Sequence, residues 1–387
     1  MTLYNTPTKV IFGKGAEKEV KNAILEQNAH KVLIHYGSDR IEKEGLLPFV
    51  EKQLQEANID YVKLGGVVPN PRLSLIRKGI ELCTREGIDF ILAIGGGSVI
   101  DSAKAIGYGV FNEGDVWDFF TKKRTPQGCL GIGCILTQAA AGSEMSSSCV
   151  VTKEEGNLKR GCNTEYCRLR FALCNPELTY SLPPYQTSCA IVDIAMHTME
   201  RFFTSGSTLE LTDNLSLALI KTTFENGLVA LKEPNNYEAR ANLMWASSLS
   251  HNGLMNIGND NRGDWSSHQL EHELSGLFDV AHGAGLAAVW SSWARYISHL
   301  IPERFSLFGQ VVFNLQPTCT PEEVIQKVEE YYHTIKMPIN ISELGIKLTD
   351  ENIEELAEKC TFFQTRTLGT VKKLGKSEIK EIYNMAR

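Results

Sequence analysis

The sequence predicts a chain of two parts, an α/β first half built on a parallel sheet and an all-α second half. Before residue 184, short strand-like segments alternate with helical ones, as in parallel sheets whose two faces are covered by helices. After Pro183-Pro184 such segments become rare and long amphipathic stretches dominate. We therefore expect domains at residues 1–184 and 185–387. A chain of 387 residues can hold two hydrophobic cores, because a single core stops growing near about 250–300 residues.

In the first half, four strands and three helices are predicted before residue 95. The strand-like segments are 9–12, 31–36, 61–64 and 89–94. Helical spacing of apolar residues covers 16–26, 47–57 and 73–86. The segment from Gly65 to Pro71 is rich in glycine and proline, which predicts a loop.

The second half contains seven amphipathic stretches long enough to be helices. They cover residues 190–204, 209–227, 237–249, 266–278, 286–300, 320–335 and 349–360. His282 follows an apolar run and precedes Gly283, which indicates a helix end or a turn into the next helix.

Composition argues against several classes of partner. The formal net charge of −7 disfavours nucleic-acid binding and offers no polybasic patch for a membrane surface. No run of 18 apolar residues predicts a membrane span, and the amino terminus lacks an apolar signal core. The ten cysteines are dispersed without a CxxC pair, so reduced thiols in a cytoplasmic protein are expected. Six lie between residues 129 and 174 and are interpreted as small buried apolar residues, although the spacings 129–134 and 162–167 could also suit a metal.

Histidines form the strongest chemical pattern of the chain. His268, His272 and His282 are three of only nine histidines, and they fall within fifteen positions. Upstream, Asp193 and His197 are four residues apart. A single histidine is more often a core or surface residue, but one carboxylate with several imidazoles is a ligand set for zinc or iron(II). Helix geometry alone favours His268 and His272 as a pair, because residues four apart share a helix face.

A glycine-rich turn, Gly95-Gly-Gly-Ser98, follows the fourth predicted strand and opens a helix. Such a turn offers backbone N–H groups and the positive end of a helix to a pyrophosphate, although tight packing alone also explains it. It matches neither GxGxxG nor the P-loop pattern. Asp39, just after the second strand, could accept hydrogen bonds from an adenosine ribose, whereas Arg40 could bind a 2′-phosphate.

Several motifs together carry a family resemblance. They are Gly65-Gly-Val-Val-Pro-Asn70-Pro, Ala93-Ile-Gly-Gly-Gly-Ser98-Val-Ile-Asp101-Ser-Ala-Lys104, Gly142-Ser-Glu144-Met, Asp193-x-x-x-His197, His268-x-x-x-His272-Glu-Leu with His282-Gly, and Tyr237-Glu-Ala-Arg-Ala-Asn-Leu-Met-Trp-Ala-Ser-Ser248. The chain resembles the iron-containing (group III) alcohol dehydrogenases, and within them the butanol-dehydrogenase and broad-range aldehyde-reductase branch. The resemblance runs from about Tyr4 to beyond Gly369.

Site residues follow from this resemblance position by position. It implies four metal ligands, Asp193, His197, His268 and His282, for iron(II) or zinc. His272 is then not a ligand and resembles a histidine beside the nicotinamide, a candidate proton relay. For NAD or NADP, with a slight preference for NAD, the resemblance implies contacts from Asp39, Asn70, Gly95, Gly96, Gly97, Ser98, Asp101, Thr137 and Lys159.

The resemblance also implies an architecture and an activity. The expected architecture is Rossmann-like and dinucleotide-binding in the first half and helical and metal-binding in the second, as in dehydroquinate synthase. The expected activity is hydride transfer between NAD(P)H and small aliphatic aldehydes or alcohols, in a cleft between the domains of a homodimer. Two positions depart from the pattern, because Ala141 replaces a common threonine and the turn at Asp39-Arg40 is less glycine-rich.

Other functions fit the sequence less well. A glycerol dehydrogenase-like polyol oxidoreductase stays open as an alternative. Dehydroquinate synthase chemistry is disfavoured because the first ligand is Asp193 instead of a glutamate and no dense Lys/Arg cluster would bind a phosphorylated substrate. A non-catalytic metal or nucleotide sensor would need a DNA- or partner-binding appendage, and the acidic, linker-free chain offers none.

Overall fold

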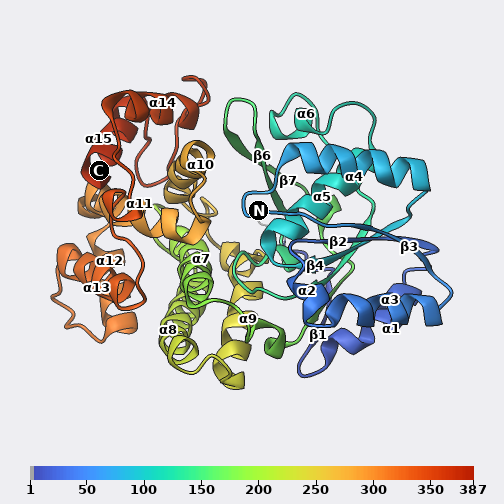
Figure 1. The fold of residues 1–387 in the computed structure, drawn as a ribbon. Helices are drawn as coiled ribbons and strands as arrows, with labels where there is room; N and C mark the ends of the chain where they lie inside the picture. The colour runs from blue at the N-terminus through green and yellow to red at the C-terminus, as the bar shows by residue number, and fades with distance from the viewer. Residues whose placement is uncertain (1–3) are drawn as a thin grey trace. The chain divides into compact units, whose positions relative to one another are not determined.

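The computed structural model describes residues 4–387, which form two compact units (Figure 1). The first unit is Asn5–Ser181, and the second is Leu182–Arg387 with Tyr4. The first is α/β and the second is helical, so the fold class predicted from the sequence is confirmed. In the described part of the chain, none of the helices has the length and apolar character to cross a membrane.

A six-stranded parallel sheet forms the centre of the first unit. Its strand order is β1-β8-β5-β4-β2-β3. The strands are β1 (Lys9–Phe12), β2 (Lys31–Tyr36), β3 (Asp60–Leu64), β4 (Phe90–Gly95), β5 (Gly131–Leu136) and β8 (Phe171–Cys174). Tyr36 pairs with Ile94, and Gly95 with Leu136. The carboxyl ends of β2, β4 and β5 therefore meet at one edge of the sheet, where open α/β sheets bind their ligands.

Helices cover both faces of this sheet (Figure 1). On one face lie α1 (Val20–Leu25) and α3 (Leu46–Glu56), whose apolar residues pack on alternate residues of the strands. On the other lie α4 (Leu73–Glu86) and α5 (Gly97–Phe111). Two short helices, α2 (Arg40–Lys43) and α6 (Trp117–Phe120), complete the set.

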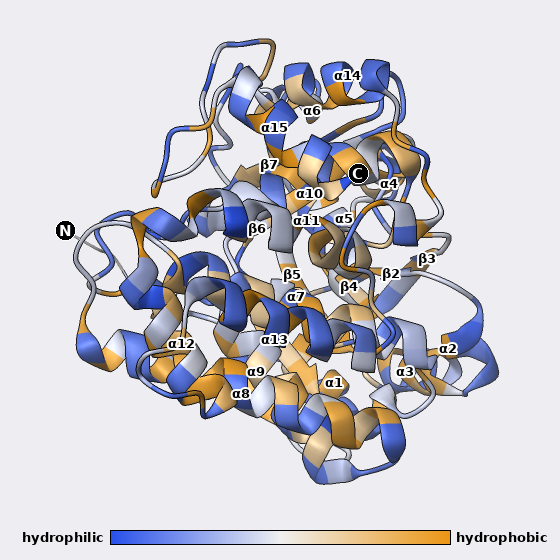
Figure 2. Cartoon of the chain, turned by 90° about the vertical axis from the view of Figure 1, so that its left-hand side faces the viewer, coloured by the Kyte–Doolittle hydropathy of each residue, from blue (hydrophilic) through white to orange (hydrophobic). Residues whose placement is uncertain are grey.

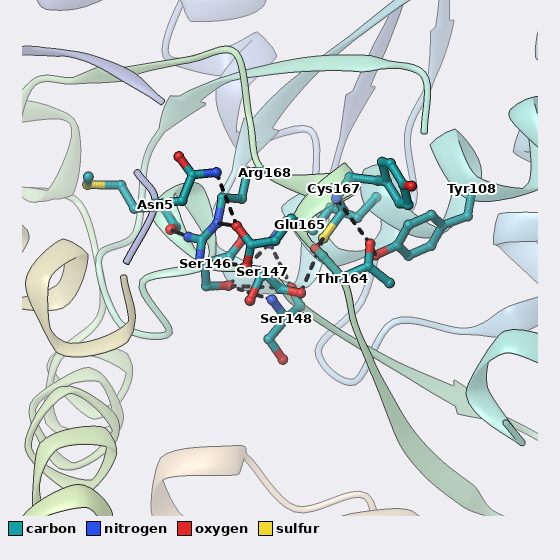
Figure 3. Close-up of polar contacts among 12 residues, drawn as sticks. Asn5, Tyr108, Ser146, Ser147, Ser148, Thr164, Glu165, Cys167 and Arg168 are labelled. Atoms are coloured by element: carbon teal, nitrogen blue, oxygen red, sulfur yellow. Dashed lines mark hydrogen bonds and ion pairs between the residues drawn. The ribbon is translucent and has the colours of Figure 1, made fainter. Parts of the chain in front are cut away.

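A two-stranded antiparallel hairpin, which the sequence did not predict, packs against α5. It consists of β6 (Ser148–Lys153) and β7 (Leu158–Asn163). Its open end is tied by the backbone N–H of Thr164, which donates to Ser147 O at 2.9 Å. Figure 3 shows this junction, where the Tyr108 hydroxyl of α5 lies 3.1 Å from Thr164 Oγ1.

An ion pair holds the same junction from the other side. Arg168 donates to both carboxylate oxygens of Glu165, at 2.6 and 3.1 Å, and to Met145 O at 2.6 Å (Figure 3). Cys167 lies between Glu165 and Arg168 in the sequence, and its thiol is 3.4 Å from Ser147 O. The segment that precedes β6 is thus fixed to the segment that follows β7.

Residues 182–387 of the second unit contain nine long helices, of which seven were predicted. They are α7 (Pro184–Phe202), α8 (Glu210–Lys232), α9 (Tyr237–His251), α10 (Ser266–Phe278), α11 (His282–Ile297), α12 (Pro302–Phe313), α13 (Pro321–Thr334), α14 (Asp350–Cys360) and α15 (Lys376–Ala386). Capping boxes at Thr320 and Thr349 start α13 and α14. In Figure 2 the outward face of α13 is largely hydrophilic, and its buried side carries residues such as Val324 and Val328.

Helix α7 is the buried centre of this unit, and α11 crosses it at very short range. A Cβ on Gly283 would lie 2.1 Å from the carbonyl oxygen of Cys189, so only glycine allows the two backbones to approach this closely. Because Gly283 follows the first residue of α11, the close crossing places His282 beside α7.

The cysteines between residues 129 and 174 lie mainly in the interior of the first unit. Cys134 and Cys174 are on sheet strands, Cys149 and Cys162 face each other across the hairpin, and Cys129 is half-buried. Burial raises the pKa of the Cys134, Cys149 and Cys174 thiols. Protonated, enclosed thiols behave as small apolar residues.

Candidate functional site

Three helices of the second unit bring the predicted metal ligands together. Asp193 and His197 lie four residues apart on one face of α7 and are both 4% exposed. His268 is near the start of α10, and His282 is the first residue of α11. All four thus come from segments that pack against one another inside the unit.

The donor atoms of these residues converge on one carboxylate oxygen, Asp193 Oδ1. It lies 3.3 Å from His197 Nδ1, 3.9 Å from His268 Nε2 and 3.6 Å from His282 Nε2. His197 Nδ1 and His268 Nε2 are buried and accept or donate no hydrogen bond among residues 4–387. A carboxylate and three imidazoles so arranged fit a divalent cation, since buried polar atoms require a partner and this donor set suits zinc or iron(II).

The surroundings of His197 favour the neutral imidazole that metal binding requires. Burial, together with the neighbouring His251, His268 and Arg201, holds the pKa of His197 well below its usual range. Arg201 itself is buried, donates to His197 O at 2.5 Å, and has its pKa lowered to about 9 by burial.

His272 lies next to this cluster, on the same helix as His268. Its ring centroid is 5.8 Å from that of His282, and it is 9% exposed. The donor atoms of Asp193, His268 and His282 form one group, and those of Glu271, His272 and His282 form a second. The structure therefore groups His268 with His282, and not with His272, around Asp193.

Two buried glutamates, which were not predicted from the sequence, contact the imidazoles of His268 and His282 at Nδ1, the ring nitrogen farther from Asp193. Glu200 Oε1 lies 3.2 Å from His268 Nδ1, and Glu271 Oε2 is hydrogen-bonded to His282 Nδ1. Burial raises the pKa of Glu200, and the bond to His268 opposes that rise. Glu200 comes three residues after His197, and Glu271 three after His268. Each glutamate nevertheless contacts a different histidine from the one three residues before it, so this spacing gave no signal for the observed pairs.

His251 and Trp265 also border the cluster. The ring of His251, the last residue of α9, lies 4.1 Å from that of His197 in an edge-to-face arrangement. Trp265 has a left-handed backbone with φ of 65° and lies 5.3 Å from the His268 ring. His251 has no chemical partner nearby in the sequence, so spacing gave no reason to select it. Strained backbone in a bulky residue is typical of functional sites.

In the first unit, the glycine turn lies between β4 and α5. Gly95 ends β4, Gly96 precedes α5, and α5 begins at Gly97. A Cβ on Gly96 would be 2.9 Å from Gln138 Cβ, and one on Gly97 would be 2.8 Å from Ala141 Cβ. The turn can therefore hold only glycine without a shift of its neighbours. Ser98 lies in the first turn of α5, where helical N–H groups lack intrahelical partners and favour an anion.

The other predicted cofactor residues gather around the same edge of the sheet or on the hairpin. Asp39 is exposed at the end of β2, and Thr137 follows β5 with its N–H donating to Gly95 O at 3.0 Å. Asn70 is buried with a left-handed φ of 56°. Lys159 lies on β7 and is 4% exposed. Arg40, the rival of Asp39 in choosing the cofactor, donates to Ser181 at 2.9 Å.

Asp101 lies one turn into α5, and its carboxylate accepts hydrogen bonds from other residues of the first unit. Its carboxylate accepts from the Ser143 hydroxyl and from Val150 N, the latter at 2.9 Å. Three residues on, Lys104 is fully buried, and its ammonium lies 2.7 Å from both Ser143 O and Ser148 O. The motif that contains Lys104 predicts no role for this residue, because a lysine is ordinarily a surface residue.

The fold is thus that of a Rossmann-like unit joined to a helical unit that carries a carboxylate–imidazole cluster. Two family models match the chain, "Iron-containing alcohol dehydrogenase" over residues 7–176 and "Fe-containing alcohol dehydrogenase family, C-terminal" over residues 187–387. The chain belongs to the iron-containing alcohol dehydrogenase family and is an oxidoreductase, as the sequence predicted.

Individual relatives cover the chain almost from end to end. It is 35% identical to NADH-dependent butanol dehydrogenase A of Clostridium acetobutylicum, over 98% of each chain. It is 30% identical to the NADPH-dependent aldehyde reductase YqhD of Escherichia coli, over 99% of this chain and 98% of the relative. The crystal structure of an NADH-dependent butanol dehydrogenase A from Thermotoga maritima superposes with a TM-score of 0.96 at 31% identity, covering 100% of this chain and 98% of that one.

Proposed function

We propose that the protein is a metal-dependent alcohol dehydrogenase and aldehyde reductase that transfers hydride between NAD(P)H and small aliphatic aldehydes or alcohols. The observation that carries the proposal is the convergence of Asp193, His268 and His282 donor atoms, with His197 beside them, in a chain of this family. The substrate class is supported by its similarity to butanol dehydrogenases and an aldehyde reductase. A glycerol dehydrogenase-like activity is not better supported by these relatives.

A divalent cation, iron(II) or zinc, would be held by Asp193, His197, His268 and His282. Bound there, it would supply Lewis acidity toward the substrate oxygen. Three of the four side chains, Asp193, His197 and His268, are each 4% exposed, so the surrounding protein restricts their movement before any substrate arrives. Preorganised ligands of this kind retain a metal without reorganising the protein.

The nicotinamide cofactor would bind on the first unit. We assign its pyrophosphate to the turn formed by Gly95, Gly96, Gly97 and Ser98, because glycines there let the backbone approach the ligand and the start of α5 favours negative charge. Asp39, Asn70, Thr137 and Lys159 would contact the rest of the dinucleotide. Asp101 would support the cofactor site indirectly, because its carboxylate accepts hydrogen bonds from Ser143 and Val150.

His272 is our candidate for moving the proton that accompanies hydride transfer. Its ring lies one helical turn from His268 and 5.8 Å from the ring of His282, so it is beside the cluster without belonging to the Asp193 group. An imidazole can donate and accept a proton near neutral pH. A His272→Ala variant should therefore keep its metal and lose rate, whereas His268→Ala should lose both metal and activity.

Cofactor choice rests on the turn after β2. The exposed carboxylate of Asp39 would accept from the ribose hydroxyls of NAD and repel the 2′-phosphate of NADP, which Arg40 could instead bind. We propose NAD as the preferred cofactor, since the butanol dehydrogenases similar to this chain are NADH-dependent, although the aldehyde reductase is NADPH-dependent. Steady-state kinetics with both cofactors on one aldehyde measures the preference directly.

Three further proposals are based on the membership of this chain in the family. Residues 1–184 would bind the dinucleotide and residues 185–387 the metal. The protein would be a homodimer, which light scattering on the purified chain tests. It would work in the cytoplasm, in keeping with the buried thiols at Cys149 and Cys162, which are opposite each other and reduced.

The function is tested by following NADH oxidation with butanal as substrate. Enzyme reconstituted with iron(II) or zinc should oxidise NADH only when the aldehyde is present. The His268→Ala variant provides the control, because it removes one imidazole and leaves the dinucleotide unit untouched. An absence of aldehyde-dependent oxidation with either metal and either cofactor, across aldehydes of two to six carbons, would refute the proposal.

A further inference from the structure

The imidazole of His268 is held by a buried carboxylate on its outer side. Glu200, 1% exposed, accepts the backbone N–H of His268 at 2.8 Å with Oε1, and the same oxygen lies 3.2 Å from His268 Nδ1. The opposite ring nitrogen, Nε2, lies 3.9 Å from Asp193 Oδ1. One carboxylate thus fixes both the main chain and the ring of a candidate ligand.

The imidazole of His282 has the same arrangement with a different glutamate. Glu271, which is fully buried on α10, hydrogen-bonds to His282 Nδ1 through Oε2. Its other oxygen accepts the hydroxyl of Ser275, one turn further along α10. The Nε2 of His282 is again the nitrogen nearer to Asp193, at 3.6 Å.

The hydrogen bond at Nδ1 determines which nitrogen of the imidazole can bind a cation. A carboxylate at Nδ1 requires that nitrogen to carry the proton, so Nε2 keeps its lone pair and can bind a cation. A carboxylate behind a ligating histidine also makes the ring a stronger donor and fixes its orientation. Both glutamates act on Nδ1, and both Nε2 atoms lie on the side of Asp193.

We propose that Glu200 and Glu271 are positioning residues that fix the Nδ1–H tautomer of His268 and His282 and thereby set the affinity of the site for its divalent cation. This inference rests on the proposed function, because it concerns the cation assigned to that site. Glu200 and Glu271 differ in the groups that they contact. Glu200 also anchors the main chain of α10, whereas Glu271 accepts a hydrogen bond from the Ser275 hydroxyl on its own helix.

The test compares metal binding in Glu200→Gln, Glu271→Gln and a matched control. Glutamine keeps the shape and one acceptor oxygen but removes the charge that makes the imidazole a strong donor. Glu273→Gln is the control, since Glu273 is a buried carboxylate on α10 that belongs to neither group of candidate ligands. Circular dichroism and thermal melting establish that each variant is folded.

Metal affinity is measured with zinc by competition against a chromophoric chelator, and the ligand field by the visible spectrum of the cobalt(II) form. Glu200→Gln and Glu271→Gln should each bind zinc about 10- to 100-fold more weakly than wild type. Their cobalt(II) bands should also shift. Glu273→Gln should match wild type in both measurements. Replacement by aspartate, which restores the charge at a shorter reach, should recover part of the lost affinity.

The outcomes separate this inference from the proposed function. If the wild-type protein binds neither zinc nor cobalt(II), the metal site itself is refuted, and the inference fails with it. If wild type binds zinc while both glutamine variants retain its affinity and spectrum, only the positioning role is refuted. It is refuted equally if Glu273→Gln weakens binding as much as the other two, since the effect would then come from loss of any buried negative charge in these helices.

Discussion

Replacing Lys104 by methionine tests how the segment between the glycine turn and the hairpin is held. Lys104 is fully buried on α5, and its ammonium lies within hydrogen-bond distance of three backbone carbonyls, at 2.7 Å from Ser143 O, 3.1 Å from Ser146 O and 2.7 Å from Ser148 O. The hydroxyls of Ser143 and Ser146 add contacts at 2.9 and 3.3 Å. A lysine has three protons, so every one of them can be bound.

The size of the effect follows from these bonds. Methionine fills the volume of the lysine stem but removes the ammonium from the carbonyls of Ser143, Ser146 and Ser148. A net contribution of about 1 kcal/mol for each lost hydrogen bond, and more where the donor is charged, gives a loss of about 3 kcal/mol or more in the free energy of unfolding. The glycine turn to which we assign the cofactor lies at the start of the same helix, so NADH binding should weaken as well.

Unfolding in urea is followed by the fluorescence of Trp117, the single tryptophan of residues 5–181, after the other four tryptophans are replaced by phenylalanine. Lys78→Met, at an exposed position on α4, is the matched control and should change stability by less than about 0.5 kcal/mol. An unfolding free energy for Lys104→Met equal to that of the control would show that the buried ammonium does not hold this segment.

Two further predictions concern pH and close packing. The imidazole of His35 is fully buried between Leu64 O and the Ser102 hydroxyl, and burial lowers its pKa from 6.5 to about 4. Because the unfolded chain takes up a proton near pH 6.5 and the folded chain does not, wild type should lose about 3 kcal/mol of stability relative to His35→Gln as the pH falls from 6.5 to 4. Parallel stability curves for the two proteins would contradict this. In Gly283→Ala, the new methyl would lie 2.1 Å from the backbone oxygen of Cys189, so α11 must shift. The free energy of unfolding should fall by about 1–3 kcal/mol or more. Zinc binding should weaken as well, because the shift displaces His282. Thermal melting against Gly161→Ala, whose methyl meets nothing closer than 3.7 Å, measures the effect, and equal melting temperatures would refute it.

Much of the fold could be predicted because periodicity reports directly on strands and helices. The first four sheet strands were predicted within one residue of their observed ends, since each is a short segment rich in β-branched, aromatic or other apolar residues next to turn residues. The strands β5 and β8 were missed. Glycines such as Gly131 and Gly133 interrupt the apolar run of β5, and only pairing with neighbouring strands shows it to be central. Helices α12 and α15 were missed as well, and α11 begins four residues before its predicted start.

The candidate site was predictable as a set of residue types but not as a geometry. Spacing alone paired His268 with His272, because residues four apart share a helix face. The close crossing of α11 and α7 at Gly283 instead brings His282 next to Asp193, and no local pattern reveals a contact between distant helices. The roles of Glu200 and Glu271 were equally hidden, since a buried carboxylate can be recognised only once its imidazole partner is in place.

The central claim is that a cation held by Asp193, His197, His268 and His282 is required for aldehyde reduction by NAD(P)H. The most direct measurement strips the protein with a chelator, determines its metal content, and follows NADH oxidation by butanal before and after one equivalent of iron(II) or zinc is restored. We predict that activity falls with the metal content and returns on reloading, and that His268→Ala does not respond. Full activity in protein without bound metal would contradict the account.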